Sequence, residues 1–369
     1  KLGIELSRQA WVHRLNRGEF EDSSWTGFSA QKGALRVPYR SAGQLKTLWA
    51  NDVWIDDQVL DLDVGEESIR GRFKGNGEAQ PPFYLASPKI TDSLSLLITH
   101  VPSALSLLRS PDMGSGSMLF SSAFRAGALS ACFLIVNYAS RELLDIDPEE
   151  IEVLEPRVQR FNDGRVLPVL QMADQLVNGS GLCDRLAQPG LSGEPIVLEV
   201  MREIVGNRAQ SPLAELMAST HRERCFQGCY RCLHRYGNQP YHGLLDWRLG
   251  LDVIQLMLDP SYVAGLGGSF LAPGIEDWRD QALKLAKEAA LLFGTEARMV
   301  GDVPVIGLGG SGVAAVLHPF WNKDLALERN PALEALYLET ASMFWTTTFE
   351  LSRRMGEVMF RLRTGNDLG

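Results

Sequence analysis

Three cysteines lie within eight consecutive positions of the sequence, at Cys225, Cys229 and Cys232. Three residues and then two residues separate them, which lets thiolates from one turn converge on a tetrahedral Zn²⁺ at about 2.3 Å. Five cysteines in 369 residues are too few for a dense disulfide framework. Cysteines crowded in this way in a reducing compartment are typical of a metal site. The sequence therefore predicts a structural zinc ion and a cytoplasmic location.

A structural zinc site needs a fourth ligand, and the sequence offers several. Cys183 follows the turn Gly179-Ser180-Gly181 and is our first candidate. His221, four residues before Cys225, is the second, and His234 and His242 are further possibilities.

Two other interpretations of the cysteines remain open. They could be free thiols on a helix and turn, or ligands of a catalytic zinc that keeps one position open for water. His221-Arg222-Glu223 matches the His-x-Glu of zinc deaminases, but Cys225 follows too soon to leave room for the usual strand and helix. We predict no catalytic residue.

Arginines and aromatic residues alternate around the cysteines. Arginine binds phosphates and aromatic faces stack on bases, a combination typical of single-strand binding. The alternative is that these arginines pair with nearby acids while the aromatic rings pack around the metal. The residues predicted to bind nucleic acid are Arg231, Arg235, Tyr236 and Arg248.

Other motifs are weak. No Walker lysine motif occurs in the sequence, so it contains no complete ATPase motor. The glycines at 307–312 lie between two expected strands and favour a hairpin turn over a nucleotide site. A nuclease centre in the last hundred residues would have to use Glu296, Asp302, Lys323 and Asp324, whose spacing matches no standard pattern.

Hydrophobic periodicity predicts a mixture of strands and helices. Residues 1–75 are expected to be β-rich, and apolar residues recur at helical spacing over 121–144. Further helices are expected at 195–205, 212–219, 244–258, 276–293 and 339–363, with strands at 147–159, 297–308 and 312–318 and a strand that leads into a turn over 167–186. We predict an α+β (mixed α/β) fold in which a zinc-stabilised domain of helices and a sheet is followed by a smaller C-terminal α/β module. The expected parts are a β-rich region at 1–120, the zinc-binding domain at 121–258 and the module at 275–369.

The overall charge limits the partners. Lysine and arginine number 36 and acidic residues 45, for a net charge of −9, which excludes a globally basic nucleic-acid coat but not a local basic patch. No apolar run approaches the roughly 18 residues of a membrane span, so we expect no membrane partner. The chain starts at KLGIEL without an initiator methionine, and we expect it to be a piece of a longer protein.

The motifs together resemble a known family. An early LNRG, LLDID at 143–147, DQLVNGSGLC at 174–183, and the cysteine cluster continuing to Asp246-Trp247-Arg248 are similar to the MrfA-type zinc-binding (MZB) domain family. That family is found at the C-terminal end of superfamily 2 DNA helicases and in their partners. It includes MrfA-like repair helicases, the DrmB subunit of DISARM phage defence, and Druantia-type and Dpd-type defence helicases. The resemblance covers residues 10–258, and the cysteine-to-Trp247 stretch is its specific part.

The resemblance implies roles for particular residues. Cys225, Cys229 and Cys232 match the family's zinc cysteines. MrfA-like helicases keep a further cysteine beside them where this chain has Glu223 or Arg224, and that departure favours Cys183 as the fourth ligand. Polar or packing support around the metal is expected from Asn238, His242, Asp246 and Arg248.

The function that the resemblance implies is a non-motor, zinc-binding C-terminal part of a helicase-like DNA-processing protein, or a partner subunit of one. It would guide single-stranded or forked DNA and organise an ATP-dependent motor in cis or in trans. Antiphage defence is favoured over DNA repair. The alternative is a zinc-stabilised protein–protein scaffold without DNA contact.

Overall fold

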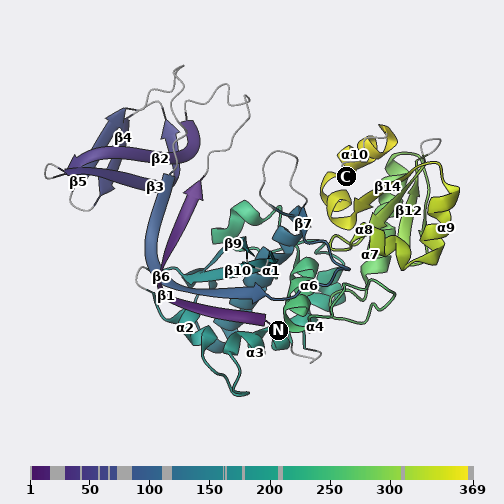
Figure 1. The fold of residues 1–369 in the computed structure, drawn as a ribbon, viewed down its shortest axis with the longest axis horizontal. Coiled ribbons are helices and arrows are strands. Elements are labelled where there is room, and N and C mark those ends of the chain that lie inside the picture. The colour runs from purple at the N-terminus through teal and green to yellow at the C-terminus, as the bar shows by residue number, and fades with distance from the viewer. Residues whose placement is uncertain are drawn as a thin grey trace. The chain divides into compact units, whose positions relative to one another are not determined.

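In the computed structural model the described residues fall into two compact units. One contains residues 1–7, 93–173 and 181–369, and the other contains 8–92 and 174–180. The described residues are 2–16, 30–41, 44–56, 59–64, 67–72, 85–109, 119–160, 162, 164–176, 179–206, 211–308 and 312–364. Figure 1 shows the chain from its N-terminus to its C-terminus.

The smaller unit is made of strands, as expected for the early part of the sequence. Two antiparallel hairpins pair β2 with β3 and β4 with β5, and the first is interrupted by an irregularity between Gly33 and Leu35. Two further strands, β1 and β6, have residues in both units. The bounds are β1 (Leu2–Asn16), β2 (Ala30–Ser41), β3 (Gln44–Asp56), β4 (Val59–Val64), β5 (Glu67–Arg72) and β6 (Leu85–Ile98).

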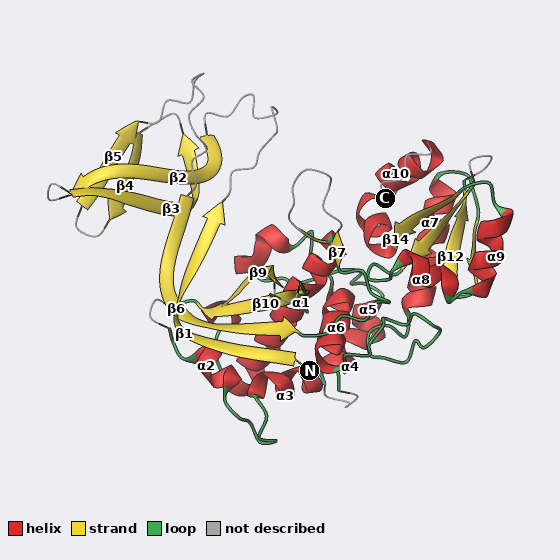
Figure 2. Ribbon diagram, viewed as in Figure 1, coloured by secondary structure: helices red, strands yellow, loops and turns green. Residues whose placement is uncertain are grey.

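The larger unit begins with a four-stranded sheet in the order β1-β6-β10-β9. Strands β6 and β10 are antiparallel, with Val169 opposite Leu97 and Ala173 opposite Ser93. Strands and helices are both present (Figure 2), which confirms the α+β fold class. The bounds in this part are β7 (Leu108–Arg109), β8 (Leu119–Phe120), α1 (Ser122–Ala139), the π-turn η1 (Ser140–Leu144), the 3₁₀ turn η2 (Pro148–Glu150), β9 (Ile151–Arg160), β10 (Val166–Asp174), α2 (Leu182–Ala187), α3 (Ile196–Ile204), α4 (Pro212–Met217), α5 (Ser219–Arg222), the 3₁₀ segment η3 (Tyr236–Tyr241) and α6 (Trp247–Leu258).

Helix α1 is the central element of this unit and packs against β9, α3 and α6. The Ser121 side chain caps its first turn, as serine does at helix starts. A Cβ on Gly127 would lie 2.8 Å from the Leu249 carbonyl on α6, and a Cβ on Gly250 of α6 would lie 2.9 Å from the Ser130 Cβ on α1. The two glycines therefore let the helix backbones approach each other directly. By length and composition, residues 122–144 could cross a membrane, but 78% of the apolar window is buried inside the fold.

The last hundred residues form a second sheet with helices around it. Its order is β11-β12-β13-β14, with β11, β12 and β13 antiparallel and β13 parallel to β14. The bounds are α7 (Trp278–Leu292), β11 (Ala297–Val300), β12 (Val303–Gly307), β13 (Val313–Leu317), α8 (Lys323–Glu328), α9 (Pro331–Glu339), β14 (Met343–Thr347) and α10 (Thr348–Thr364).

Two expectations for this region were wrong in detail. The single strand expected at 297–308 is two strands, because the chain reverses at Gly301, whose φ of +59° suits glycine. The helix expected from 339 begins at Thr348, because residues 343–347 form β14. The turn expected at Gly309-Gly310 lies outside the described residues.

Residues 275–369 belong to the larger unit together with the residues before them. One hydrophobic core runs from Leu94 to Phe349 and includes Leu251 of α6 together with Val303 and Leu317 of the second sheet. A smaller core, which includes Leu351 of α10, lies among α7, β12, β13 and α10. The boundary expected near 275 therefore lies within the larger unit.

Candidate metal centre

The cysteine cluster is held by turns between α5 and η3. His221 is in the last turn of α5, and its carbonyl accepts a hydrogen bond from the Cys225 N–H at 2.8 Å. The Cys229 carbonyl accepts from three successive N–H groups, those of Cys232, Leu233 and His234, each at 3.0 Å. These local bonds fold the chain into a tight knuckle. All four side chains, His221 and the three cysteines, therefore point to one spot.

The geometry of the four ligand atoms fits a zinc ion. All of them lie within 4.8 Å of one another. The Cys232 Sγ is 3.7 Å from the Sγ atoms of both Cys225 and Cys229, and the Cys229 Sγ is 3.5 Å from His221 Nε2. Bonds of about 2.3 Å to sulfur and about 2.05 Å to nitrogen in a regular tetrahedron give sulfur–sulfur separations of about 3.8 Å and sulfur–nitrogen separations of about 3.6 Å. The donor set can thus accept the ion with little movement.

The surroundings of the ligands also suit a metal site. His221 Nδ1 donates to the Leu216 carbonyl at 2.9 Å, which leaves the Nε2 lone pair free to face the thiols. The Cys229 N–H donates to the Cys232 Sγ at 3.3 Å. A hydrogen bond from the Cys225 thiol, followed by the Cys229 N–H and His221, lowers the pKa of Cys232 to about 5. The same pairing and burial raise the pKa of Cys225.

The knuckle is tied to two helices beneath it. Asn137 of α1 donates through Nδ2 to the Cys232 carbonyl at 3.0 Å. Trp247, the first residue of α6, donates through Nε1 to the Cys225 carbonyl at 3.1 Å. Both contacts are buried, so the metal-binding turn is part of the core. This arrangement is typical of a structural site.

In the structure His221, not Cys183, lies beside the three cysteines and completes the candidate ligand set. Cys183 is fully buried in α2 and is not part of the cluster. None of the five cysteines, all of them in the described part of the chain, forms a disulfide. A four-residue spacing places His221 and Cys225 on neighbouring turns of one helical face. This spacing is the signal in the sequence that favours His221.

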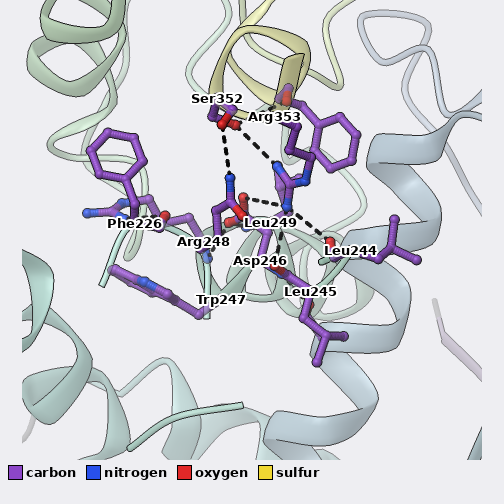
Figure 3. Close-up of polar contacts among 12 residues, drawn as sticks. Phe226, Leu244, Leu245, Asp246, Trp247, Arg248, Leu249, Ser352 and Arg353 are labelled. Atoms are coloured by element: carbon purple, nitrogen blue, oxygen red, sulfur yellow. Dashed lines mark hydrogen bonds and ion pairs between the residues drawn. The ribbon is translucent and has the colours of Figure 1, made fainter. Parts of the chain in front are cut away.

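The other residues that match the family motif support the knuckle or the next helix. Asn238 is buried, donates to the Leu233 carbonyl at 2.9 Å, and accepts from His242 Nε2 at 2.9 Å. Asp246 caps α6 and lies 3.6 Å from Arg353 of α10 (Figure 3). These contacts agree with the polar support that the resemblance implies.

The residues predicted to bind nucleic acid lie in three different environments. Arg231 and Tyr236 are exposed, and the Tyr236 side chain is 81% accessible. Arg235 is half-buried, and its Nη1 donates to the carbonyls of Tyr230 and His234 at 3.3 Å and 3.0 Å.

Arg248 differs from the other three residues. Its guanidinium stacks 4.1 Å from the Trp247 ring and lies 3.2 Å from Asp277, and its side chain is only 13% exposed. Arg248 is therefore engaged within the fold. The neighbouring Tyr230, which is not among the residues predicted to bind nucleic acid, is 65% exposed.

The acidic residues considered for a nuclease centre do not come together. Asp302 pairs with Arg279 at 2.9 Å. Across the described ranges, the cluster at His221 is the one group of three or more His, Cys, Asp or Glu side chains with metal-binding geometry.

Comparisons with known proteins give one similar solved structure. No protein-family model and no curated protein matches this chain. The crystal structure of the DUF1998 helicase MrfA bound to DNA is similar at 12% sequence identity and a TM-score of 0.28, over 69% of this chain and 26% of that chain. The chain thus spans about a quarter of that helicase. A likeness of this size identifies neither a family nor an activity.

Proposed function

We propose that this chain is a zinc-stabilised, non-motor part or partner subunit of a helicase-like DNA-processing protein. One observation carries the proposal: a buried His-Cys₃ knuckle with zinc geometry presents Arg231 and Tyr236 to solvent. When bound, zinc supplies folding free energy, because the ion ties the four ligands of the turn together. The motif resemblance to the MZB family supports the same conclusion.

The proposed partner is DNA, single-stranded or forked. Four arginines and one glutamate lie between positions 222 and 236, against a net charge of −9 for the chain. Arg231 and Arg235 would bind backbone phosphates, and Tyr236 would contact bases. Arg248 instead holds Asp277. The role includes guiding a strand for an ATP-dependent motor in cis or in trans, within the cytoplasm, in antiphage defence or DNA repair.

The competing candidate is a protein–protein scaffold. It is favoured by the acidic net charge and by Arg248, which is already paired within the fold. A scaffold would keep the zinc knuckle but would bind no DNA.

The test is fluorescence anisotropy of labelled single-stranded, forked and duplex DNA, titrated with the zinc-loaded chain at two salt concentrations. We expect binding that weakens steeply with salt, because phosphate contacts release counterions. Arg231→Ala should weaken binding and reduce the salt slope by about one unit, since it removes one phosphate contact. Arg354→Ala, which removes an exposed arginine on α10, is the matched control and should leave binding unchanged. Absence of binding at low salt would support the scaffold.

A further inference from the structure

Tyr230 is an exposed aromatic ring with a fixed orientation. Its ring centroid lies 5.7 Å from His234 and 5.6 Å from His242, at 89° and 88° to their planes. The two imidazoles are themselves stacked, 3.9 Å apart and 7° from parallel. A ring that is equidistant from two stacked rings must lie beside the stack, and these distances are typical of edge-to-face contact. The two imidazoles therefore contact Tyr230 from one side, and 65% of the residue is exposed to solvent.

The imidazole stack beneath Tyr230 is held in place. His242 Nε2 donates to Asn238 Oδ1 at 2.9 Å and to the Arg235 carbonyl at 3.0 Å. His234 packs so closely on the knuckle that a Cβ on Gly228 would lie 2.7 Å from its Nε2. The Tyr230 carbonyl accepts from Arg235 Nη1. An exposed ring that is fixed in advance loses little conformational entropy when it binds a partner.

We propose that the exposed ring of Tyr230 stacks on an unpaired nucleobase. The inference rests on the proposed function, because it assumes that nucleic acid reaches the knuckle. It adds a residue and a mode of recognition: Tyr230 contacts the base, while the neighbouring arginines contact the backbone. Every base has a π-face, so this contact is tolerant of sequence.

The local chemistry favours a base over other partners for this ring. The segment around it carries more arginine than acid, so an arginine brought by a protein partner would be repelled, whereas an anionic backbone would be attracted. Bases inside a duplex are covered on both faces by their neighbours. Only an unpaired or terminal base offers a free face, so the platform should discriminate between single strands and duplexes.

The experiment uses the full, zinc-loaded chain and a short thymidine oligonucleotide that contains one fluorescent purine analogue. Stacking on an aromatic ring should quench the analogue. Tyr230→Ala should abolish the quenching and weaken single-strand binding between about fivefold and 150-fold, while the salt slope stays unchanged. Tyr230→Phe should keep both quenching and affinity, because the ring and not the hydroxyl makes the contact. Tyr337→Ala, at a half-exposed tyrosine on α9, is the matched control.

The outcomes separate this inference from the proposed function. If the chain binds single strands and Tyr230→Ala leaves both affinity and quenching intact, the stacking platform is wrong and the DNA-binding module stands. If the chain binds no DNA at all, the proposed function fails first. Equal losses of single-strand and duplex affinity in Tyr230→Ala, with zinc content and thermal midpoint unchanged, would also overturn the preference for unpaired bases. A variant that has lost zinc is replaced by Tyr230→Leu, which keeps an apolar side chain without an aromatic face.

Discussion

The guanidinium of Arg353 on α10 lies 3.6 Å from the carboxylate of Asp246, the residue that caps α6, and each side chain is 13% exposed. The same guanidinium donates to the carbonyls of Leu244 and Leu245 at 3.0 Å and 3.2 Å (Figure 3). Burial raises the pKa of Asp246, although Arg353 and Arg248 act in the opposite direction. The C-terminal helix is thereby fixed to the chain that leaves the His-Cys₃ knuckle.

A second set of ion pairs joins the same two regions, with the acid in the C-terminal part and the arginines beside the cysteine cluster. Asp277, immediately before α7, lies 3.2 Å from Arg248 and 3.9 Å from Arg222. Arg222 is next to the ligand His221, and Arg248 stacks on Trp247. The metal site and the last hundred residues are therefore expected to unfold together, because charged pairs at this depth are costly to separate.

Arg353→Ala should lower the free energy of unfolding by about 1–3 kcal/mol, because it removes the charge-assisted contacts of Arg353 with the largely buried Asp246 carboxylate and the carbonyls of Leu244 and Leu245. Urea denaturation of the zinc-loaded chain measures this loss. The control is Arg354→Ala: that side chain is 71% exposed and pairs with Glu357 at 3.9 Å, so its loss should cost under about 0.5 kcal/mol. Equal losses of unfolding free energy in the two variants would contradict the conclusion that Arg353 fixes α10 to the chain at residues 244–246.

The metal ligand set gives the next prediction. His221→Ala should release zinc, because it removes one of four ligands and leaves three thiolates that cannot close the tetrahedron. Cys183→Ala should keep a full equivalent of zinc, because that thiol lies in α2 and outside the cluster. Elemental analysis of the purified variants measures zinc per chain.

Comparison of the two variants also separates the loss of a ligand from a general loss of stability. Cys183→Ala removes a buried side chain and should lower the thermal midpoint slightly while metal is retained. Zinc loss in Cys183→Ala together with zinc retention in His221→Ala would restore the ligand set first expected from the sequence. Cys229→Ser should behave as His221→Ala does and unfold the middle of the chain.

Local spacing in the sequence predicts the three cysteines of the candidate metal site, whereas the structure brings His221 rather than Cys183 to them. Cys225, Cys229 and Cys232 are close in sequence, so a short turn suffices to bring them together. The choice between Cys183 and His221 depends on where α2 packs, and that position is determined by the whole core. The four-residue spacing between His221 and Cys225 favours the histidine, because residues four apart lie on the same face of a helix.

Long-range partners explain the other differences. Asp246 and Arg248 could be recognised as a motif, but Arg353 and Asp277 could not be assigned to them, because nothing in a single sequence pairs residues that far apart. Likewise, Arg231 and Arg248 cannot be distinguished from the sequence, because both are arginines close to the cysteines and to aromatic residues. Only the position of Asp277 shows that Arg248 is engaged internally. The helices α1 and α6 were predicted well because each is a long apolar stretch whose residues are local features of the sequence: α6 has one apolar face, and α1 is buried on nearly all sides.

A buried polar cluster next to α6 gives a prediction about pH. The Tyr262 hydroxyl donates to Asp252, which also accepts from His318 Nε2 at 3.2 Å, and all three side chains are buried. Burial, and then the adjacent Asp252 carboxylate, raise the pKa of Tyr262 well above its ordinary value of 10.0. The folded state thus binds this proton more tightly than the unfolded state does.

The sign of the effect follows from that difference. The contribution of Tyr262 to stability is complete below about pH 10, where the unfolded phenol is still protonated, and is lost as the pH rises towards the higher folded pKa. The wild-type chain should therefore lose up to about 1.4 kcal/mol of unfolding free energy per pH unit above pH 10 from this group. At neutral pH the free energy of unfolding of Tyr262→Phe should be about 1–3 kcal/mol below that of the wild type, because Asp252 loses a buried donor. Above pH 10 the free energy of unfolding of this variant should decrease less steeply with pH. Denaturant unfolding at pH values on both sides of 10 measures the two slopes, with Tyr337→Phe on the half-exposed face of α9 as the control. If the wild type and Tyr262→Phe lose stability in parallel, the Tyr262 proton does not contribute to alkaline stability, and the cluster acts through packing alone.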